Sequence, residues 1–370
     1  MLLVSEPGLG PEETAALSGV IADNWITMGD RVRAFEKAFA AEHGVADAVA
    51  VNSCTAALHL ALQALAIGPG DEVLVPSMSF VATSNAVLYT GARPVFVDIE
   101  SPGVPLMSCA HAAEKVTART RAVIIMHYAG YLADRSSWRD FARTYNLPLI
   151  EDSAHAVGRL RTGLFGDAAA FSFYGNKNMT TGEGGMIIAH DPAVLEKARQ
   201  ARGHGMTSGT LTRLRERPAS YDVTMLGANY RMNELSAAIG LVQLEKLSGW
   251  NDTRETLTRA YRLALKETCP GLDIPFSADW RSAHHIMPVL LPPGADRMAV
   301  MNSLRDAGIQ TSMHYPPIHQ LSLYSQMYPG TSLPQTEEFA ARQLTLPLHP
   351  KMEAAQVETV ARALAHALAG

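Results

Sequence analysis

A chain of 370 residues, 47% hydrophobic and 18% charged, is long enough for two domains and too apolar to be disordered. Its net charge of −5 gives no basic surface for a nucleic acid or an anionic membrane, so neither partner is expected. No apolar run approaches the roughly 20 residues that cross a bilayer, and the first residues do not resemble a signal peptide. The three cysteines are too scattered for a disulfide framework or a zinc site, so we expect a cytoplasmic protein without a bound metal.

The first elements along the chain are expected to be a helix over 11–22 and a second helix that Asp30 can cap. Short apolar runs then alternate with helical stretches such as 55–66, 80–89 and 137–145. The candidate strands are 48–52, 72–75, 94–98, 122–127, 148–152, 168–173 and 185–189. This alternation predicts an α/β fold with a mostly parallel sheet of about seven strands, covered by helices on both faces.

The second half of the chain begins with a long polar segment, 203–221, which contains Arg213, Arg215 and Arg217. We expect either a functional, partner-facing loop or local disorder. A helical pattern follows from Met232 toward Leu265, with a break expected near Gly249. Beyond it lie a strand-like stretch at 285–291, a helix near 298–307 and a terminal helix from Met352. We therefore predict a large domain over 1–250 and a smaller C-terminal α/β domain over 251–370.

One lysine, Lys177, follows the strand 168–173 in a turn rich in glycine. A lysine hemmed in by apolar residues and glycine backbone loses hydration, and burial lowers the pKa of its ammonium group. The neutral amine can then form a Schiff base with an aldehyde. The alternative interpretation of this stretch alone is an ordinary solvated lysine in a loop.

Two other strand ends offer groups for a phosphorylated, planar ligand. The strand 48–52 leads into a helix at Ser53 and Thr55, and a helix N-terminus there would form an anion cradle. The alternative is an ordinary helix cap. Phe80 follows the strand 72–75 and could stack on a planar ring, although core packing would also explain an aromatic side chain here.

The strand 148–152 ends in Asp152 and is followed by His155. A carboxylate at this edge can pair with a protonated ring nitrogen, which suits the electron-sink chemistry of pyridoxal phosphate. His155 could donate to a ring hydroxyl. A helix cap and a structural histidine are the respective alternatives. Because carboxyl ends of parallel strands meet at one edge, the convergence of a cradle, an acid and Lys177 favours a cofactor site. The motifs of zinc, Ser-His-Asp and dinucleotide sites are absent from the sequence.

Taken together, these motifs resemble those of the fold-type I pyridoxal-phosphate enzymes, and within them the DegT/StrS-like sugar aminotransferases. The resemblance runs essentially from end to end. It rests on WITMG at 25–29, GPGDEV at 68–73, PVFVD at 94–98, EDSAH at 151–155, FSF at 171–173 followed by Lys177, GEGG at 182–185, GANYRM at 227–232 and HYPP at 314–317.

The resemblance implies a role for each matching residue. Lys177 would form the internal aldimine and move protons, Asp152 would contact the pyridine nitrogen, and His155 would contact the 3-hydroxyl side. Phe80 would stack on the ring. The residues implied for the phosphate are Cys54, Thr55, Ala56 and Ser172, with Asn229 reaching the site of a neighbouring subunit in a homodimer. The residues implied for substrate are Trp25, Met28, Tyr174, Arg231, His314, Tyr315 and His319. A turn built on Pro316 and Pro317 is the alternative for 314–319.

The sequence departs from the family at Cys54, where glycine is usual. A cysteine requires that the turn avoid dihedral angles open only to glycine, so the phosphate geometry is in question. The implied reaction moves an amino group from glutamate, through pyridoxamine phosphate, to a keto-sugar that is most simply a nucleotide-linked keto-deoxysugar. Arg213, Arg215 and Arg217 could cover its diphosphate. Alternatives are a cyclitol ketone aminotransferase, a sugar dehydratase, in whose relatives histidine replaces the lysine, or a regulatory pyridoxal-phosphate-binding protein without turnover.

Overall fold

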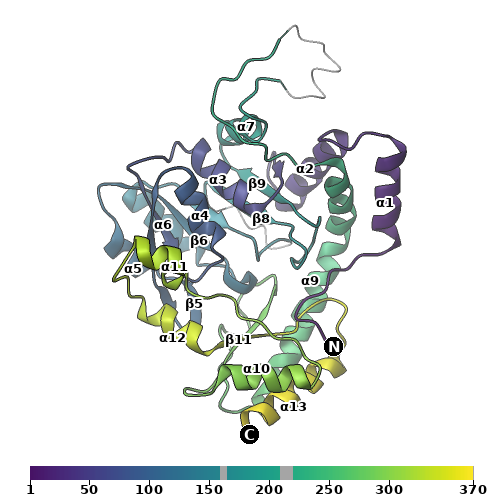
Figure 1. Ribbon diagram of the computed structural model, residues 1–370, viewed down its shortest axis with the longest axis vertical. Coiled ribbons are helices and arrows are strands. Elements are labelled where there is room, and N and C mark those ends of the chain that lie inside the picture. Colours follow the sequence, from purple (N-terminus) through teal and green to yellow (C-terminus); the bar gives the residue numbers. More distant parts are fainter. Residues whose placement is uncertain (159–164, 209–219, 370) are drawn as a thin grey trace.

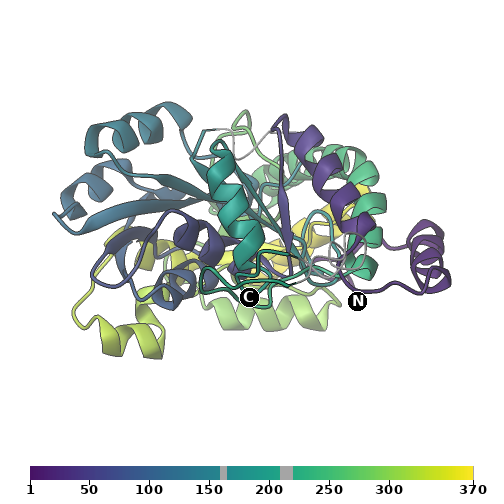
Figure 2. The same ribbon diagram turned by 90° about the horizontal axis from the view of Figure 1, so that it is seen from above.

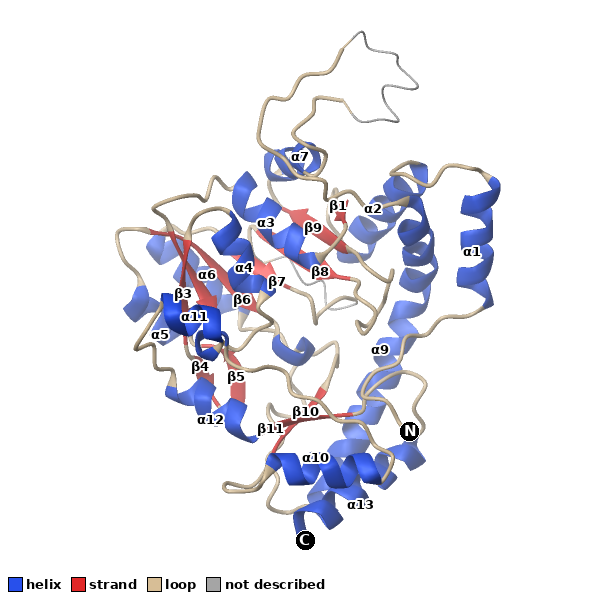
Figure 3. Ribbon diagram, viewed as in Figure 1, coloured by secondary structure: helices blue, strands red, loops and turns tan. Residues whose placement is uncertain are grey.

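A computed structural model describes residues 1–158, 165–208 and 220–369, and its centre is a seven-stranded sheet (Figure 1 and Figure 3). The strands are β1 (Val49–Val51), β2 (Glu72–Pro76), β3 (Arg93–Val97), β6 (Thr120–Met126), β7 (Leu149–Asp152), β8 (Ala168–Ser172) and β9 (Gly185–Ala189). Their order is β1-β9-β8-β7-β6-β2-β3, and only β9 runs antiparallel to its neighbours. All seven predicted strands are present, and the predicted mostly parallel sheet is confirmed.

Both faces of the sheet are covered because alternate side chains of each strand point to opposite sides. Ala168 and Ala170 pack in one core with α3 (Cys54–Ala64) and α7 (Pro192–Ala201). Ala169 and Phe171 pack in another with α2 (Asp30–His43) and α9 (Glu234–Thr268). The remaining covering helices are α4 (Ala82–Tyr89), α5 (Cys109–Lys115) and α6 (Arg135–Tyr145). The strands are therefore apolar on both faces, as their sequences indicate.

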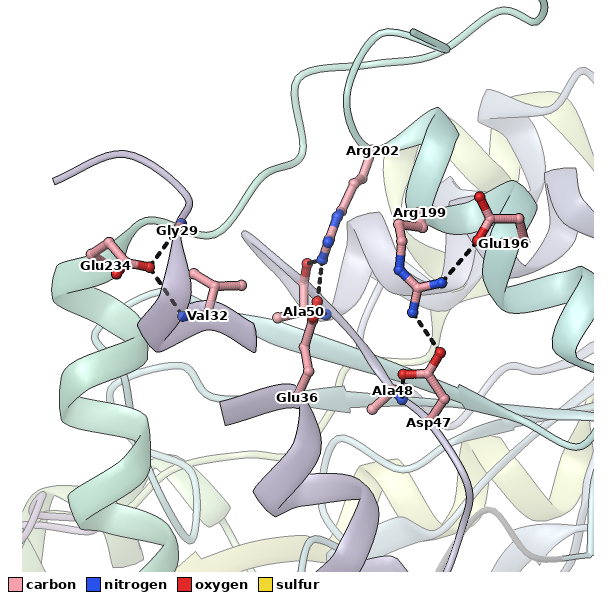
Figure 4. A network of polar contacts seen from close by, with 10 residues as sticks. All are labelled: Gly29, Val32, Glu36, Asp47, Ala48, Ala50, Glu196, Arg199, Arg202 and Glu234. Atoms are coloured by element: carbon pink, nitrogen blue, oxygen red, sulfur yellow. Dashed lines mark hydrogen bonds and ion pairs between the residues drawn. The ribbon is translucent and has the colours of Figure 1, made fainter. Parts of the chain in front are cut away.

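At Ala50, the outer side of the edge strand β1 is closed by an ion pair (Figure 4). Ala50 donates its N–H to Glu36 Oε1 at 2.9 Å, and its carbonyl accepts from Arg202 Nη1 at 2.6 Å. Arg202 also donates directly to Glu36. The pair thus satisfies the outward backbone groups that an edge strand would otherwise expose.

Helix α9 is continuous over 35 residues, so the predicted break near Gly249 is wrong. Glycine and asparagine are poor helix formers, but tertiary contacts override that preference here. Trp250 packs beneath Gly8, where an added Cβ would lie 2.5 Å from the indole. Asn251 donates to Val157 O at 3.2 Å and accepts from Asn178 Nδ2 at 2.8 Å. These contacts hold both residues on the helix.

A separate core lies at the C-terminal end of α9, where the lower part of Figure 1 places both chain ends. It contains the antiparallel pair β10 (Met287–Leu290) and β11 (Gln343–Leu346) with α10 (Arg297–Asp306) and α13 (Ala354–Ala369). Leu2 belongs to this core and bridges to Ile309. The division into domains at residue 250 remains a prediction, since that position lies within α9.

Several elements were not expected from the sequence. They are the hairpin of β4 (Ile99–Ser101) and β5 (Val104–Met107), the helices α5 and α7, α11 (Ser322–Met327), α12 (Pro334–Arg342) and strand β11. The predicted first helix matches α1 (Pro11–Ala22), which Figure 2 shows standing out from the body on one side. No described helix is long and apolar enough to cross a membrane. Within the described ranges, no group of three or more acidic, cysteine or histidine side chains is suited to a metal ion.

The polar segment 203–221 is described only at its two ends. Met206 bridges to Val223, and Gly203 bridges to Asn229. The three arginines of the expected nucleotide-covering loop, Arg213, Arg215 and Arg217, lie outside the described residues.

Candidate active site

Strand register brings the predicted cradle, acid and lysine to one edge of the sheet. Gly185 of β9 pairs with Val51 of β1 on one side and with Ser172 of β8 on the other. Asp152 of β7 pairs with Ala170, two residues before Ser172. The segments that follow these strand ends therefore start side by side, which is the ligand-binding edge of such a sheet.

The N-terminus of α3 offers backbone N–H groups to an anion. Ser53 caps the helix from an extended conformation, with its Oγ accepting from Ala56 N–H at 3.1 Å. The N–H groups of Cys54 and Thr55 then remain for an anion, because the first N–H groups of a helix have no partner within it. A Cβ on Gly185 would lie 2.5 Å from the Ser53 carbonyl group, so only glycine leaves this approach open.

Cys54 fits this cradle without backbone strain. It is the first residue of α3 and has no positive φ, so the glycine that is usual in the family is not needed for the turn. Burial, reinforced by the charge of Asp152, raises the pKa of its thiol well above the ordinary value. Cys54 is therefore a neutral, buried side chain, and all three cysteines of the chain are free.

Lys177 lies in the turn between β8 and β9, which is closed at its base by Phe173 N–H donating to Gly184 O at 2.9 Å. The next residue, Asn178, is anchored through its amide to Asn251 and to Ala283 O at 2.8 Å each. Lys177 is half-buried, and loss of hydration lowers its pKa from 10.5 to about 8, against the opposing effect of the Asp152 charge. A substantial neutral fraction is thus available near neutral pH.

Asp152 is almost completely buried at the end of β7. Burial raises the pKa of its carboxyl group, while a hydrogen bond from Thr83 Oγ1 at 2.7 Å and one from Ala154 N–H at 3.2 Å act in the opposite direction. A carboxylate in this position is stabilised further when a cation approaches it. A protonated ring nitrogen would be such a cation.

His155 is held by its two ring nitrogens. Nδ1 accepts from Ala129 N–H at 3.2 Å, so the neutral ring carries its proton on Nε2 and donates to the Tyr315 hydroxyl at 2.8 Å. Burial lowers the pKa of His155 well below the ordinary value, which keeps it neutral. The hydroxyl proton of Tyr315 is then free to point into the site. Both ring nitrogens of His155 thus have partners within the protein, and its predicted contact with the cofactor remains a prediction.

An aromatic wall completes the site. The ring of Phe80 lies 5.8 Å from that of Tyr315, and 56% of Phe80 is exposed, so one of its faces is open to a planar ligand. His285 packs 4.2 Å from His155, and burial lowers its pKa well below the ordinary value. His314, whose Nδ1 bonds to Thr345 at 2.9 Å, has its pKa lowered to about 4 by burial. These histidines add no charge near Lys177 at neutral pH.

The remaining predicted residues lie elsewhere. Met28 and Arg231 line a cleft of about 630 Å³ between α2 and α7, and none of the residues lining it belongs to the cluster around Lys177. Trp25 packs against Gly29 near the same cleft. Asn229 lies beside β1, where its carbonyl accepts from Asn52 at 3.4 Å. Their contacts with cofactor or substrate remain predictions.

His319 and Tyr174 differ in their surroundings. His319 is buried, and its two ring nitrogens already bond to Ser77 Oγ at 2.7 Å and Glu337 Oε1 at 3.1 Å. Tyr174 is half-exposed in the turn that carries Lys177 and is open to a ligand. A substrate contact from His319 would require one of its two bonds to break, whereas Tyr174 needs no rearrangement.

Sequence reasoning missed the side chains that surround the predicted ones. Ser79 precedes Phe80 in the turn before α4, Thr83 lies in the first turn of α4, and His285 comes from the distant C-terminal part of the chain. The sequence did contain a signal for Thr83 and Ser79, because both are close to Phe80 in sequence and Thr83 comes at the start of a helix. Nothing in the sequence placed His285 beside His155.

The arrangement fits pyridoxal phosphate. It combines a lysine with a lowered pKa, a buried carboxylate, an open aromatic face and an anion cradle that a glycine keeps open. Each group matches one part of the cofactor, namely the aldehyde, the ring nitrogen, the ring face and the phosphate. The fold and site define a pyridoxal-phosphate-dependent enzyme of fold type I.

Comparisons with known proteins agree with this class. The model of the DegT/DnrJ/EryC1/StrS aminotransferase family matches residues 7–365. The spore coat polysaccharide biosynthesis protein SpsC of Bacillus subtilis (strain 168) is 37% identical over 372 residues, covering 97% of this chain and 95% of that protein. The chain therefore belongs to the DegT/DnrJ/EryC1/StrS aminotransferase family.

Solved structures support the same assignment. The aminotransferase TlmJ from Streptoalloteichus hindustanus is 35% identical with a TM-score of 0.90, covering 100% of this chain and 99% of that chain. The putative sugar aminotransferase Spr1654 from Streptococcus pneumoniae, in its PMP form, is 26% identical with a TM-score of 0.91, covering 100% of this chain and 99% of that chain. The expectation of a sugar aminotransferase that uses pyridoxal phosphate is confirmed.

Proposed function

We propose that the protein transfers an amino group from glutamate to a nucleotide-linked keto-deoxysugar, with Lys177 as the residue that binds the cofactor covalently. The observation that carries this proposal is the half-buried Lys177, whose pKa is lowered to about 8 beside the buried carboxylate of Asp152. Membership of an aminotransferase family supports the reaction class. A cyclitol ketone is the second candidate acceptor.

Each residue has a stated task in this proposal. Pyridoxal phosphate, when bound, supplies the electron sink that stabilises a carbanion next to nitrogen. Lys177 Nζ takes a proton from the donor's α-carbon and later returns one to the sugar carbon. Asp152 holds the ring nitrogen in its protonated form. Thr55 and Ser172 bind the phosphate, and Phe80 covers the ring face and excludes water from it.

The acceptor would lie against side chains on the open side of this cluster. Tyr174 and Tyr315 are the nearest candidates, since one is half-exposed beside Lys177 and the other presents a free hydroxyl proton. His314, Trp25, Met28 and Arg231 are proposed as further contacts, and His319 as a more distant one. Arg231 lines the cleft between α2 and α7, and a guanidinium group can bind a diphosphate through paired hydrogen bonds.

We further propose that the protein works as a homodimer in the cytoplasm. Asn229 lies at the edge of the sheet beside β1 and would reach the phosphate site of the partner subunit. The outward location of this segment and the exposed Leu226 near it support a subunit contact. The three free, scattered cysteines fit a reducing compartment.

Two other functions compete with amino transfer. A sugar dehydratase on the same fold is disfavoured because the family's dehydratases resemble this chain except for a histidine in place of the lysine, and the chain has Lys177. A regulatory protein that binds the cofactor without turnover is disfavoured by the absence of a DNA-binding signature in the sequence.

Glutamate added to the cofactor-loaded protein tests the proposal. The visible absorbance of the bound aldehyde should fall, and one equivalent of 2-oxoglutarate per site should appear. A panel of nucleotide keto-sugars should then restore the band, and the acceptor that does so fastest identifies the substrate class. Lys177→Arg should release no 2-oxoglutarate, whereas Lys351→Arg, an exposed surface lysine, should behave as wild type. An unchanged spectrum with glutamate would overturn the proposed donor.

A further inference from the structure

A chain of three buried oxygen-bearing side chains ends on Asp152. Ser79 Oγ lies 2.6 Å from Thr83 Oγ1, and Thr83 Oγ1 lies 2.7 Å from Asp152 Oδ2. Ser79, Thr83 and Asp152 are at most 4% exposed. Ser79 and Phe80 lie in the turn between β2 and α4, and Thr83 lies in the first turn of α4, so one short stretch supplies both the stacking ring and the contact to the acid.

The direction of the protons in this chain follows from the chemistry. An ionised carboxylate can only accept, so the single hydroxyl proton of Thr83 must point to Asp152. Thr83 Oγ1 can then act only as an acceptor toward Ser79, and Ser79 must donate to it. Ser79 therefore fixes the orientation of the Thr83 hydroxyl, and the three groups form a directed chain of donors that terminates on Oδ2.

This chain acts against the burial of Asp152. Loss of hydration favours the neutral acid, and a hydrogen bond from Thr83 stabilises the ionised form. The other charged or titratable groups that interact with Asp152 are Lys177, His127, Cys54 and Tyr315. Thr83 differs from these groups because its side chain donates a hydrogen bond directly to the carboxylate. The other oxygen, Oδ1, accepts from Ala154 N–H.

We propose that Thr83, oriented by Ser79, is a positioning residue that keeps Asp152 ionised and so keeps the ring nitrogen of bound pyridoxal phosphate protonated. The inference rests on the proposed placement of Asp152 against that nitrogen. Without the Thr83 donor, the shared proton moves from the nitrogen to the carboxylate, and a neutral acid faces a neutral pyridine. The cofactor then loses both an ion pair and the positive charge that draws electrons into its ring.

The same turn provides a matched control. Ser84, the neighbour of Thr83 on α4, is fully buried, and its Oγ has no hydrogen-bond partner among the described residues. Ser84→Ala removes a buried hydroxyl from the same helical turn without touching Asp152. Thr83→Val keeps the shape of the side chain and removes the donor, and Thr83→Ser keeps the donor and removes a methyl group.

The experiment measures the protonation of the ring nitrogen directly. Each variant is loaded with saturating pyridoxal phosphate labelled with ¹⁵N in the ring, and the ¹⁵N chemical shift is recorded at pH 7.5. The affinity of the apo-protein for the cofactor is measured in parallel. Thr83→Val should move the shift toward that of neutral pyridine and weaken binding about tenfold. Ser79→Ala should move it in the same direction by less, and Thr83→Ser and Ser84→Ala should match wild type.

The outcomes separate the inference from the function on which it rests. Asp152→Asn should give the neutral-pyridine shift, and no change in that variant would mean that Asp152 does not face the ring nitrogen. If the ¹⁵N shift changes in Asp152→Asn but stays at the wild-type value in Thr83→Val, the inference about Thr83 is wrong, while the placement of Asp152 against the ring nitrogen stands. If Thr83→Val fails to fold, Ser79→Ala decides, and a shift equal to that of Ser84→Ala overturns the inference.

Discussion

Lys177 and Asp152 could be selected from the sequence because Asp152 ends one strand of a predicted parallel sheet and Lys177 lies in the turn that follows another. The carboxyl ends of such strands share one edge, so sequence positions far apart become spatial neighbours. Ser172 came from the family resemblance, but the same reasoning selected Thr55. It requires only the strand boundaries, which the apolar runs define well, and the register confirms that these ends adjoin.

Residues whose function depends on a side-chain direction could not be selected in this way. His155 is a neighbour of Asp152 in sequence, yet its contacts with Tyr315 and His285 come from a segment more than 120 residues away. The orientation of Thr83 toward Asp152 depends on how α4 starts after β2. Hydrophobic patterns do not determine these side-chain directions, so the contacts of His155 and Thr83 could not be predicted from the sequence.

The lowered pKa of Lys177 predicts how fast the apo-protein takes up its cofactor. Only the neutral amine attacks an aldehyde, and with a pKa of about 8 about one amine in ten is neutral at pH 7, against about one in 3,000 for an ordinary lysine. The rate of pyridoxal phosphate uptake, followed by stopped-flow absorbance, should therefore rise with pH and level off above a midpoint near 8.

The effect of the Asp152 charge on the pKa of Lys177 can be tested through the pH midpoint of cofactor uptake. The negative charge of Asp152 favours the ammonium form of Lys177 and raises its pKa. Asp152→Asn should therefore shift the midpoint to lower pH. A midpoint above 10 in the wild-type protein would mean that the amine is fully hydrated, and the argument from burial would be wrong.

The position of strand β1 depends on side chains from two neighbouring helices. It is only three residues long and lies at the sheet edge, yet it delivers Ser53 and Thr55 to the cradle. Its backbone groups at Ala50 are satisfied by Glu36 from α2 and by Arg202 at the end of α7. The stability of the cradle therefore depends on a buried ion pair of two helices.

Removing one partner of that pair should be costly, because it leaves the other charge buried and alone. Arg202→Met should lower the free energy of unfolding by about 3 kcal/mol, measured by urea denaturation of the apo-protein. The double variant Glu36→Met/Arg202→Met should recover part of this loss. Arg199→Met is the control, since Arg199 is a third exposed and pairs with exposed carboxylates, which predicts a cost below about 1 kcal/mol. Equal losses for Arg202→Met and Arg199→Met would contradict the edge-closing role.

Helices were predicted less completely than strands. Helix α7 and the hairpin of β4 and β5 were missed, and α9 was predicted with a break. In α9 the poor helix former Asn251 is held by hydrogen bonds to residues far along the chain, including Asn178 beside Lys177. Local propensity therefore failed where a long helix is fixed by the site itself.

At the scale of the whole molecule, the two ends of the chain meet in one core. Leu2 packs with α13 and the strands β10 and β11, so the smaller core includes the first residues as well as the last. A division of the chain into two consecutive segments could not assign the N-terminal residues to the C-terminal core. His314 and Tyr315 lie between the two cores, which explains how the C-terminal part of the chain contributes to a site built on the large sheet.

The family model matches residues 7–365 of the chain. The account depends on a covalent bond between Lys177 and the cofactor aldehyde. Reduction of the loaded protein with borohydride, followed by proteolysis and mass spectrometry, measures that bond directly. The account predicts a stable pyridoxyl label on Lys177 and on no other residue. A label on another lysine, or an unlabelled protein that had been fully loaded, would contradict it.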